Sequence, residues 1–174
     1  MADSTDVSTD EGGLYLARRE DLATRHMVGG AADARRTPDL VLTALDRAVA
    51  RIAPRRGSYT IQTGAARTPP PPTRPGWRYG LTASMSRQGP WGDHACIESW
   101  HRLLKRDGVS LSHCRTRAAA RTALFASIEG FYHRRRLPSA VGYRTPQEAV
   151  VAERTAQAMH SPFAAVHDLD ISPR

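Results

Sequence analysis

Short apolar runs predict β-strands at three places along the chain. Residues 14–17 (LYLA) form an apolar run between glycine and charged residues, which is typical of a strand. Residues 25–28 (RHMV) indicate a second, weaker strand that ends before Gly29 and Gly30. Residues 80–85 (GLTASM) predict a third short strand. A helical segment is expected between the second strand and the third.

Capping residues and helical spacing predict four helices. The first begins with Thr37 as its N-cap and ends before Pro54. Two more are predicted over residues 93–108 and 116–135, and a fourth begins at the capping box of residues 145–148. The apolar residues expected to be buried are Leu42, Leu45 and Val49, flanked by Val41 and Ile52, in the first helix, Ile97, Trp100 and Leu104 in the second, and Ala120, Leu124, Ile128, Phe131 and Tyr132 in the third.

The segment between residues 57 and 79 follows no apolar period. It holds four consecutive prolines, which stop both helix and sheet. Taken alone, this composition indicates a linker. A linker at this point would split a small domain into two pieces, neither of which is able to bury a core.

The 174-residue chain is long enough for one domain with a core. We expect that domain over residues 1–150, with residues 58–78 irregular, and a flexible C-terminal tail over residues 151–174. Because no apolar run reaches about 18 residues, no membrane span is expected. The acidic N-terminus is not a signal peptide. Because the two cysteines make no disulfide framework, a reduced cytoplasmic setting is expected. The two separated cysteines, Cys96 and Cys114, make no metal pair and are expected as small buried hydrophobes.

The charge balance is basic. Lysine and arginine number 25 against 17 aspartates and glutamates, so the formal net charge is +8. Such a balance favours a polyanionic partner, of which nucleic acid is the commonest. The alternative is the basic composition of a GC-rich genome, because arginine, alanine and proline are all abundant.

One acid, Glu98, lies inside the basic helix predicted over residues 93–108. His94 and His101 share its face at helical spacing, and the apolar stripe occupies the neighbouring face. Glu98 is therefore expected at the rim of the core. A lone glutamate on a helix is ordinarily solvated or salt-bridged, and one acid does not make a metal site.

A long ordered string surrounds Glu98. From Gly80 to about Val150 the chain reads S-M-S-R-x-G, D-x-A-x-x-E-S, L-K and I-E-G-F-Y-x-R-R-R-L-x-S-A-x-G-Y-x-T-P. This string closely resembles the C-terminal part of bacterial insertion-sequence transposases of the retroviral-integrase superfamily. The resemblance implies an α/β fold, the RNase H-like integrase core. In that core a central mixed sheet is flanked by helices, here with the first strand truncated and the central strand region disrupted.

The resemblance also implies metal-dependent cleavage and joining of DNA strands for transposition. Family members hold two Mg²⁺ ions between two strand aspartates and one helix glutamate. Glu98 takes the place of that glutamate. The T-x-x-L-V-x-x-A-L text from Thr37 to Leu45 also resembles the family, and counting back places Asp3 on the first aspartate. Asp3 and Glu98 are therefore the expected catalytic residues and Mg²⁺ ligands.

The second aspartate of the family has no counterpart. Counting back from Glu98 at the family's spacing reaches Gln62, so position 62 or 63 lacks its carboxylate. Read one base earlier, the codons of residues 58–68 permit L-L-H-H-S-D-R-G-S-x-Y, with Asp or Asn at position 63. We therefore hypothesise that residues 58 to about 78 are translated out of frame and that the frame returns by Gly80. The DNA sequence tests this directly.

Basic side chains suit contact with the DNA backbone, because phosphates are neutralised by arginine and lysine. The alternative is a solvated basic helix face. The implied partners are the transposon ends and target DNA, a second copy of the chain or a companion first-frame protein, and no membrane. The residues expected to contact DNA are Arg87, Arg102, Lys105, Arg106, Arg134, Arg135 and Arg136.

Three functional hypotheses follow. The first is a DNA-integrating transposase whose catalysis is impaired by the missing aspartate. The second is a non-catalytic basic DNA-binding remnant. The third is an unstable pseudogene product whose scrambled central segment prevents folding. Nicking, DNA-binding and thermal-unfolding assays distinguish them.

Overall fold

The computed structural model describes residues 1–53, 59–62, 79–85 and 114–159. The first half contains strands β1 (Ala2–Val7), β2 (Leu14–Glu20), β3 (Met27–Asp33), β4 (Tyr59–Gln62) and β5 (Thr82–Met85), with helix α1 (Pro38–Ile52) between β3 and β4. The second half is helical. It contains α4 (Arg117–Phe125), the π-helix η3 (Ala126–Tyr132), α5 (His133–Arg135), the 3-10 helix η4 (Ser139–Val141) and α6 (Pro146–Met159).

The strands form one mixed sheet in the order β3-β2-β1-β4-β5. β1 is central and pairs antiparallel with β2 from Ala2↔Arg19 to Val7↔Leu14. On its other side β1 pairs parallel with β4 at Ala2↔Gln62. This arrangement confirms the expected α/β fold with a central mixed sheet.

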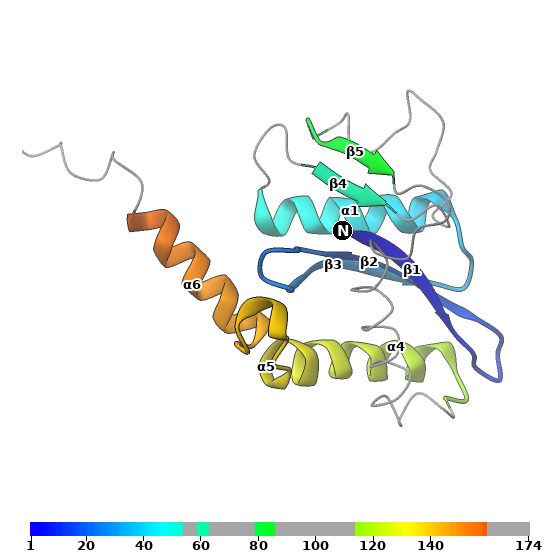
Figure 1. Cartoon of the computed structure of the whole chain (residues 1–174). Helices are drawn as coiled ribbons and strands as arrows, with labels where there is room; N and C mark the ends of the chain where they lie inside the picture. Colours follow the sequence, from blue (N-terminus) through cyan, green and yellow to red (C-terminus); the bar gives the residue numbers. More distant parts are fainter. Residues whose placement is uncertain (54–58, 63–78, 86–113, 160–174) are drawn as a thin grey trace, which may run out of the picture.

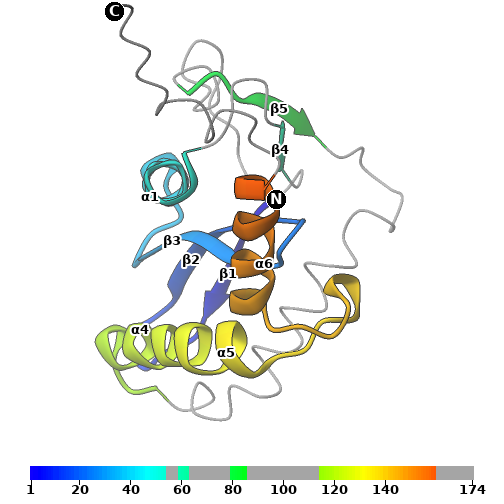
Figure 2. The same cartoon turned by 90° about the vertical axis from the view of Figure 1, so that its left-hand side faces the viewer.

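Helices cover both faces of the sheet (Figures 1 and 2), with α1 on one side and α4 on the other. The α4 side holds a core of eight buried residues. It confirms most of the predicted stripe, which recurs every four residues and continues through the wider π-helix. Phe131 is the exception, because its side chain is 39% exposed. The eight residues are Leu14, Leu16, Met27, Cys114, Ala120, Leu124, Ile128 and Tyr132.

The α1 side is packed more closely than the sequence suggested. Gly29 lies inside β3, not after it, and a Cβ built there would be 2.3 Å from the carbonyl oxygen of Ala44. The backbones of β3 and α1 therefore approach each other directly. As a result the buried stripe of α1 contains small residues, and the predicted flanking residue Ile52 is 47% exposed. The buried residues are Leu40, Ala44, Leu45 and Ala48.

Several boundaries differ from those expected. β2 continues past Ala17 to Glu20, because both of its edges are hydrogen-bonded to neighbouring strands. β4 forms within the segment expected to be irregular, where Tyr59, Thr60 and Ile61 have side chains that favour strands. Residues 151–159, expected in a flexible tail, continue α6.

The predicted caps of the first and fourth helices are confirmed, whereas the helix predicted over residues 93–108 lies outside the described residues. Thr37 caps α1, and its side chain accepts a hydrogen bond from the backbone N–H of Leu40. At α6 the backbone N–H of Thr145 donates to Glu148 Oε2 at 2.8 Å, and the N–H of Glu148 donates to Thr145 Oγ1 at 3.2 Å. These reciprocal bonds are the capping box read from the sequence.

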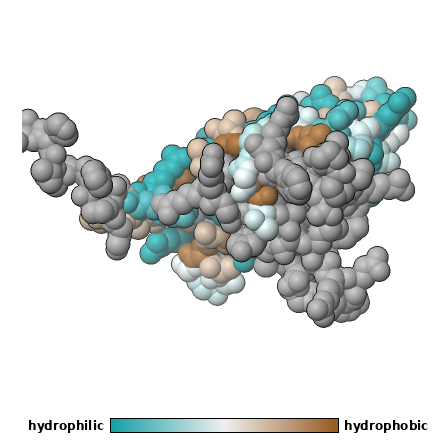
Figure 3. All heavy atoms as spheres, turned by 90° about the horizontal axis from the view of Figure 1, so that it is seen from above, coloured by the Kyte–Doolittle hydropathy of each residue, from teal (hydrophilic) through white to brown (hydrophobic). Residues whose placement is uncertain are grey.

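The surface carries small apolar patches among polar residues. Figure 3 shows such patches on the face seen from above. Among the described residues, none of the helices is both long and apolar enough to cross a bilayer.

Candidate functional site

Asp3 lies on β1, the central strand, and its side chain is half-buried. Alternate residues of a strand point to opposite faces, so Asp3 shares its face with Val7, which packs against the α4-side core. Directly across the antiparallel pair stands Arg18 of β2. The predicted first aspartate therefore faces the helical layer formed by α4 and η3.

Position 62 lies where the second aspartate was expected. The Cα of Gln62, the last residue of β4, pairs with the Cα of Ala2, the residue before Asp3. The register thus brings the end of β4 next to the part of β1 that carries Asp3. The residue there is a glutamine, and Thr63 falls outside the described residues.

Glu98 and four of the residues expected to contact DNA also lie outside the described residues. These four are Arg87, Arg102, Lys105 and Arg106. In the part of the chain that the structure describes, no group of three or more His, Cys, Asp or Glu side chains is placed to hold a metal. Asp3 is the one described carboxylate of the expected ligand set, and its partner across the β1–β2 pair is Arg18. The described residues therefore do not fit a two-metal centre.

The face of the sheet that carries Asp3 contains a buried ion network that the sequence did not suggest. Arg18 Nη1 lies 2.6 Å from Glu20 Oε2, and the two residues are 2% and 4% exposed. Arg25 Nη1 lies 3.6 Å from Glu20 Oε1. The Tyr132 hydroxyl donates a hydrogen bond to the Arg25 carbonyl, which ties η3 to this corner. The four consecutive charged residues from Arg18 to Asp21 ordinarily indicate the end of a strand, so nothing in this segment marked it as buried.

A second polar cluster joins β3 to η3. The rings of His26 and His133 stack with centroids 3.8 Å apart and planes 14° apart. The Met27 N–H donates to His133 Nε2 at 3.1 Å, and His133 Nδ1 lies 3.0 Å from Glu129 Oε2. Because Nε2 accepts, Nδ1 carries the proton and donates to Glu129. This pattern holds His133 as one neutral tautomer.

The cluster changes the acidity of its members. The pKa of His26 is lowered to about 4, mainly by burial and to a smaller extent by the charges of His133 and Arg51. Burial also lowers the pKa of His133, against the opposing effect of Glu129. Burial raises the pKa of Glu129, but its bond to His133 and the nearby positive charges outweigh this effect, so the net pKa falls.

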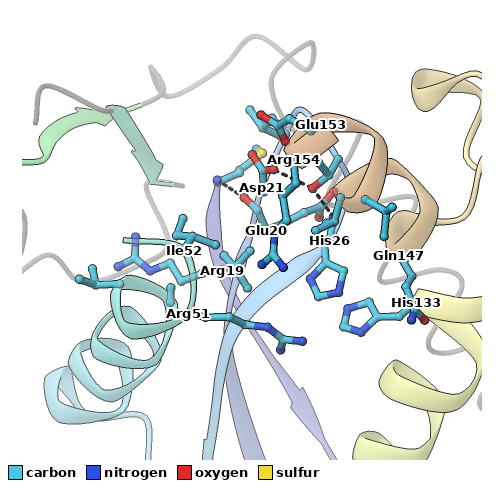
Figure 4. Close-up of a pocket in the computed structure, with 18 of the residues that line it drawn as sticks. Arg19, Glu20, Asp21, His26, Arg51, Ile52, His133, Gln147, Glu153 and Arg154 are labelled. Carbon is cyan, nitrogen blue, oxygen red and sulfur yellow. Dashed lines mark hydrogen bonds between the residues drawn. The ribbon is translucent and has the colours of Figure 1, made fainter. Parts of the chain in front are cut away.

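The histidine pair borders a cavity of about 780 Å³ between the end of α1, the β2–β3 turn, η3 and α6 (Figure 4). In the close-up, Arg19, Arg51, His26 and His133 lie around one space. The described lining residues include four arginines and four carboxylates. This balance does not favour a ligand of either sign. The eight are Arg19, Arg51, Arg134, Arg154, Glu20, Asp21, Glu129 and Glu153.

The three arginines at positions 134–136, at the end of α5, differ in exposure. Arg134 and Arg135 are exposed, as expected for residues that contact DNA. Arg136 is half-buried, and its guanidinium lies 5.8 Å from the centre of the Tyr132 ring. It therefore makes a cation–π contact within the protein.

Comparison with known proteins identifies the relatives of this chain. It is 32% identical over 149 residues to the transposase for insertion sequence element IS904 of Lactococcus lactis, covering 85% of this chain and 59% of that protein. It is 33% identical over 147 residues to the transposase InsF for insertion sequence IS3A of Escherichia coli, covering 84% and 51%. The chain thus spans between half and three-fifths of the length of these relatives. No protein-family model matches it.

The fold has counterparts among solved structures. The catalytic core domain of BIV integrase aligns with a TM-score of 0.60 at 16% identity, over 90% of this chain and 95% of that one. A chain of the simian T-cell lymphotropic virus intasome, in complex with the PP2A regulatory subunit B56 gamma, aligns with a TM-score of 0.60 at 15% identity, over 99% and 58%. The chain is therefore a relative of bacterial insertion-sequence transposases, and it has the fold of an integrase catalytic core.

Proposed function

We propose that the chain is the core portion of an insertion-sequence transposase that still binds DNA and whose strand-cleavage activity is impaired. The relatives named above are transposases, which supports DNA as the substrate. The exposed Arg134 and Arg135 and the net charge of +8 support contact with the phosphate backbone. Transposon ends and target DNA are the proposed ligands.

The register of β4 against β1 carries the proposal of impairment. It brings Gln62 to the residue beside Asp3, at the position where the resemblance calls for a carboxylate. A glutamine amide carries no charge. It therefore cannot take the place of an anionic ligand for a hard divalent cation. Of the three carboxylates that the family requires, the sequence retains Asp3 and Glu98.

A nicking assay tests this function. Supercoiled DNA carrying candidate transposon ends is incubated with the chain and Mg²⁺ or Mn²⁺, with Asp3→Asn and Glu98→Gln as matched controls. We expect wild-type cleavage no faster than that of either control, together with DNA binding that weakens as salt rises. Metal-dependent nicking by the wild type that both controls lose contradicts the impairment. Absence of DNA binding contradicts the DNA-binding role.

A stable fold is part of the proposal, because the competing hypothesis is a pseudogene product that does not fold. We expect one cooperative thermal transition. A flat, non-cooperative melt supports the pseudogene hypothesis. Sequencing the DNA that encodes residues 58–78 tests the frame hypothesis, which requires H-S-D in the neighbouring frame.

Assembly with other chains is proposed as well. One structural counterpart is part of an intasome, which supports a homo-oligomer here, and a companion first-frame protein is the alternative. Light scattering after size-exclusion chromatography, with and without DNA, measures the number of copies. A monomer in both conditions contradicts the homo-oligomer.

A further inference from the structure

We propose that the guanidinium of Arg18, and not a divalent cation, balances the charge of Asp3, so that a residue of the chain itself closes this site to metal. The inference rests on the proposed function only in taking Asp3 as the position of a metal ligand. Loss of the acid at position 62 or 63 is one departure from a metal site. Arg18 is a second departure, on a different strand.

The geometry begins with the register. Asp3 and Arg18 are direct partners across the antiparallel β1–β2 pair. The Cβ atoms of such partners lie about 5 Å apart and on the same face of the sheet. An arginine side chain easily spans that distance. Arg18 is 2% exposed, so its charge is not screened by bulk water.

Glu20 holds Arg18 in this place. Its Oε2 lies 2.6 Å from Arg18 Nη1, and its other carboxylate oxygen faces Arg25 at 3.6 Å. A buried guanidinium that makes a short, charge-assisted hydrogen bond stays in the interior of the protein. The positive charge beside Asp3 is therefore permanent, because arginine does not deprotonate in proteins.

The charge count of this face leads to the same conclusion. Arg18 and Arg25 contribute two positive charges, and Asp3 and Glu20 contribute two negative charges. Among these four described residues the charges cancel without any metal. A divalent cation at Asp3 would add two positive charges to this balanced set of described residues, beside a buried guanidinium, which is unfavourable. Asp3 is thus the cross-strand neighbour of an ion network in this chain.

The adjacent Arg19 provides a matched control. It is also buried, at 4% exposed, and it lies on the same strand. Its partner across the strand pair is Ala2, so it points to the opposite face, toward α1. Burial lowers its pKa to about 10, so it too is positively charged at neutral pH. Replacing Arg18 removes one buried charge from the face that carries Asp3, whereas replacing Arg19 removes one buried charge from the opposite face.

Manganese binding tests the proposal without reference to cleavage. Electron paramagnetic resonance measures free Mn²⁺ in titrations of the protein. The wild type is compared with two acid variants, Gln62→Asp and Thr63→Asp. Each acid variant is also combined with Arg18→Met or with Arg19→Met. We expect no site in the wild type that Asp3→Asn removes. We expect Arg18→Met to tighten Mn²⁺ binding by about tenfold or more in an acid variant, and Arg19→Met to leave it unchanged. Wild-type binding lost in Asp3→Asn, or equal effects of Arg18→Met and Arg19→Met, overturns the proposal.

The sign of a stability change gives a second test, which needs no Arg18 variant to fold. Urea unfolding of wild type and Asp3→Asn is compared in metal-free buffer containing a chelator. An ion-paired aspartate stabilises the fold, so we expect Asp3→Asn to lower the urea midpoint. If Asp3 instead belonged to a group of carboxylates that hold a metal, these would repel one another in metal-free buffer. Asp3→Asn would then raise the urea midpoint. A raised midpoint overturns the proposal. DNA binding is measured separately, and its loss contradicts the proposed function and leaves this inference standing.

Discussion

Gly29 shows how one residue sets the distance between two layers. It lies in the middle of β3, where α1 passes so closely that the Ala44 carbonyl and the Ala48 side chain occupy the space of a Cβ. In a strand interior glycine is ordinarily unfavourable, because it loses more conformational entropy than other residues. Here its lack of a side chain allows the close approach.

We expect Gly29→Ala to destabilise the fold by about 1–3 kcal/mol, because the new methyl group would overlap backbone that cannot move independently. Gly30→Ala is the matched control. A Cβ at Gly30 meets only the Met27 sulfur at 3.5 Å and the Ala17 carbonyl at 3.8 Å, which are ordinary contacts. Urea unfolding measures both variants. Equal effects at the two positions would contradict the close packing of α1 on β3.

The stacked histidines predict a pH dependence of stability. Burial lowers the pKa of His26 to about 4, below its usual 6.5, so the folded state favours the neutral ring. Between these values the unfolded chain binds more protons, so stability falls as pH drops from about 6.5 toward 4. The pKa of His133 is lowered as well, in the same direction. The facing charged groups are Glu129, Arg51 and Arg134, and of these only Glu129 opposes the effect.

We expect a loss of about 1–3 kcal/mol over that pH range, measured by urea unfolding in a series of buffers. His26→Gln removes the group with the larger resolved shift and should flatten the curve. A wild-type curve no steeper than that of His26→Gln would contradict the burial of a neutral pair. Arg51→Gln removes a positive charge that lowers the pKa of both histidines. The stability lost on acidification should therefore be smaller in this variant.

At the scale of elements, the capping box of α6 predicts a local change in helix stability. Thr145→Ala removes the side-chain oxygen that accepts from the Glu148 N–H, which costs about 1 kcal/mol. The hydrogen bonds between Thr145 and the Glu148 carboxyl lower the pKa of that carboxyl, so acid weakens the cap. Hydrogen exchange in the first turn of α6 is the measurement, and Gln147→Ala, at an exposed position, is the control. Unchanged exchange in Thr145→Ala would contradict the role of the box.

Features that depend on neighbouring residues in the sequence could be predicted, whereas features that depend on contacts between distant elements could not. Thr37 and the Thr145–Glu148 box were readable because a cap depends on a few neighbouring residues. The stripe of α4 and η3 was readable because its four-residue period survives the change to π geometry. In α1 the burial of Leu45 was predicted, but that of Ala44 and Ala48 was missed because the close approach to these small residues depends on Gly29, on another element. The charged end of β2 was missed because its burial depends on pairing with both neighbouring strands.

The candidate site follows the same rule. The structure has Asp3 on the central strand and pairs Gln62 with Ala2, the residue before it, since strand order and register are properties of the fold. The resemblance gave no sign of the Arg18–Glu20–Arg25 network. That network is a feature of this chain's own side chains, and only the antiparallel register brings Arg18 opposite Asp3.

At the scale of the whole molecule, the layers separate the interior from the basic surface. Three charged residues of β2, Arg18, Arg19 and Glu20, are buried in the sheet, while α5 carries exposed arginines in the helical layer (Figures 1 and 2). A basic residue contributes to DNA binding only if its charge is free to neutralise a phosphate. Arg134 and Arg135 meet this condition, whereas Arg136 is held against the Tyr132 ring.

The salt dependence of DNA binding tests that distinction. The logarithm of the binding constant falls linearly with the logarithm of salt concentration, and each phosphate contact contributes about one unit to the slope. We expect Arg134→Gln and Arg135→Gln each to reduce the slope by about 1, and Arg136→Gln to change it less. Arg47→Gln is the control of equal charge, because Arg47 lies on α1 and donates to the Gly30 carbonyl. Fluorescence anisotropy with a labelled duplex at several salt concentrations gives the slopes. If all four variants lower the slope equally, net charge alone governs binding and α5 is not the contact surface.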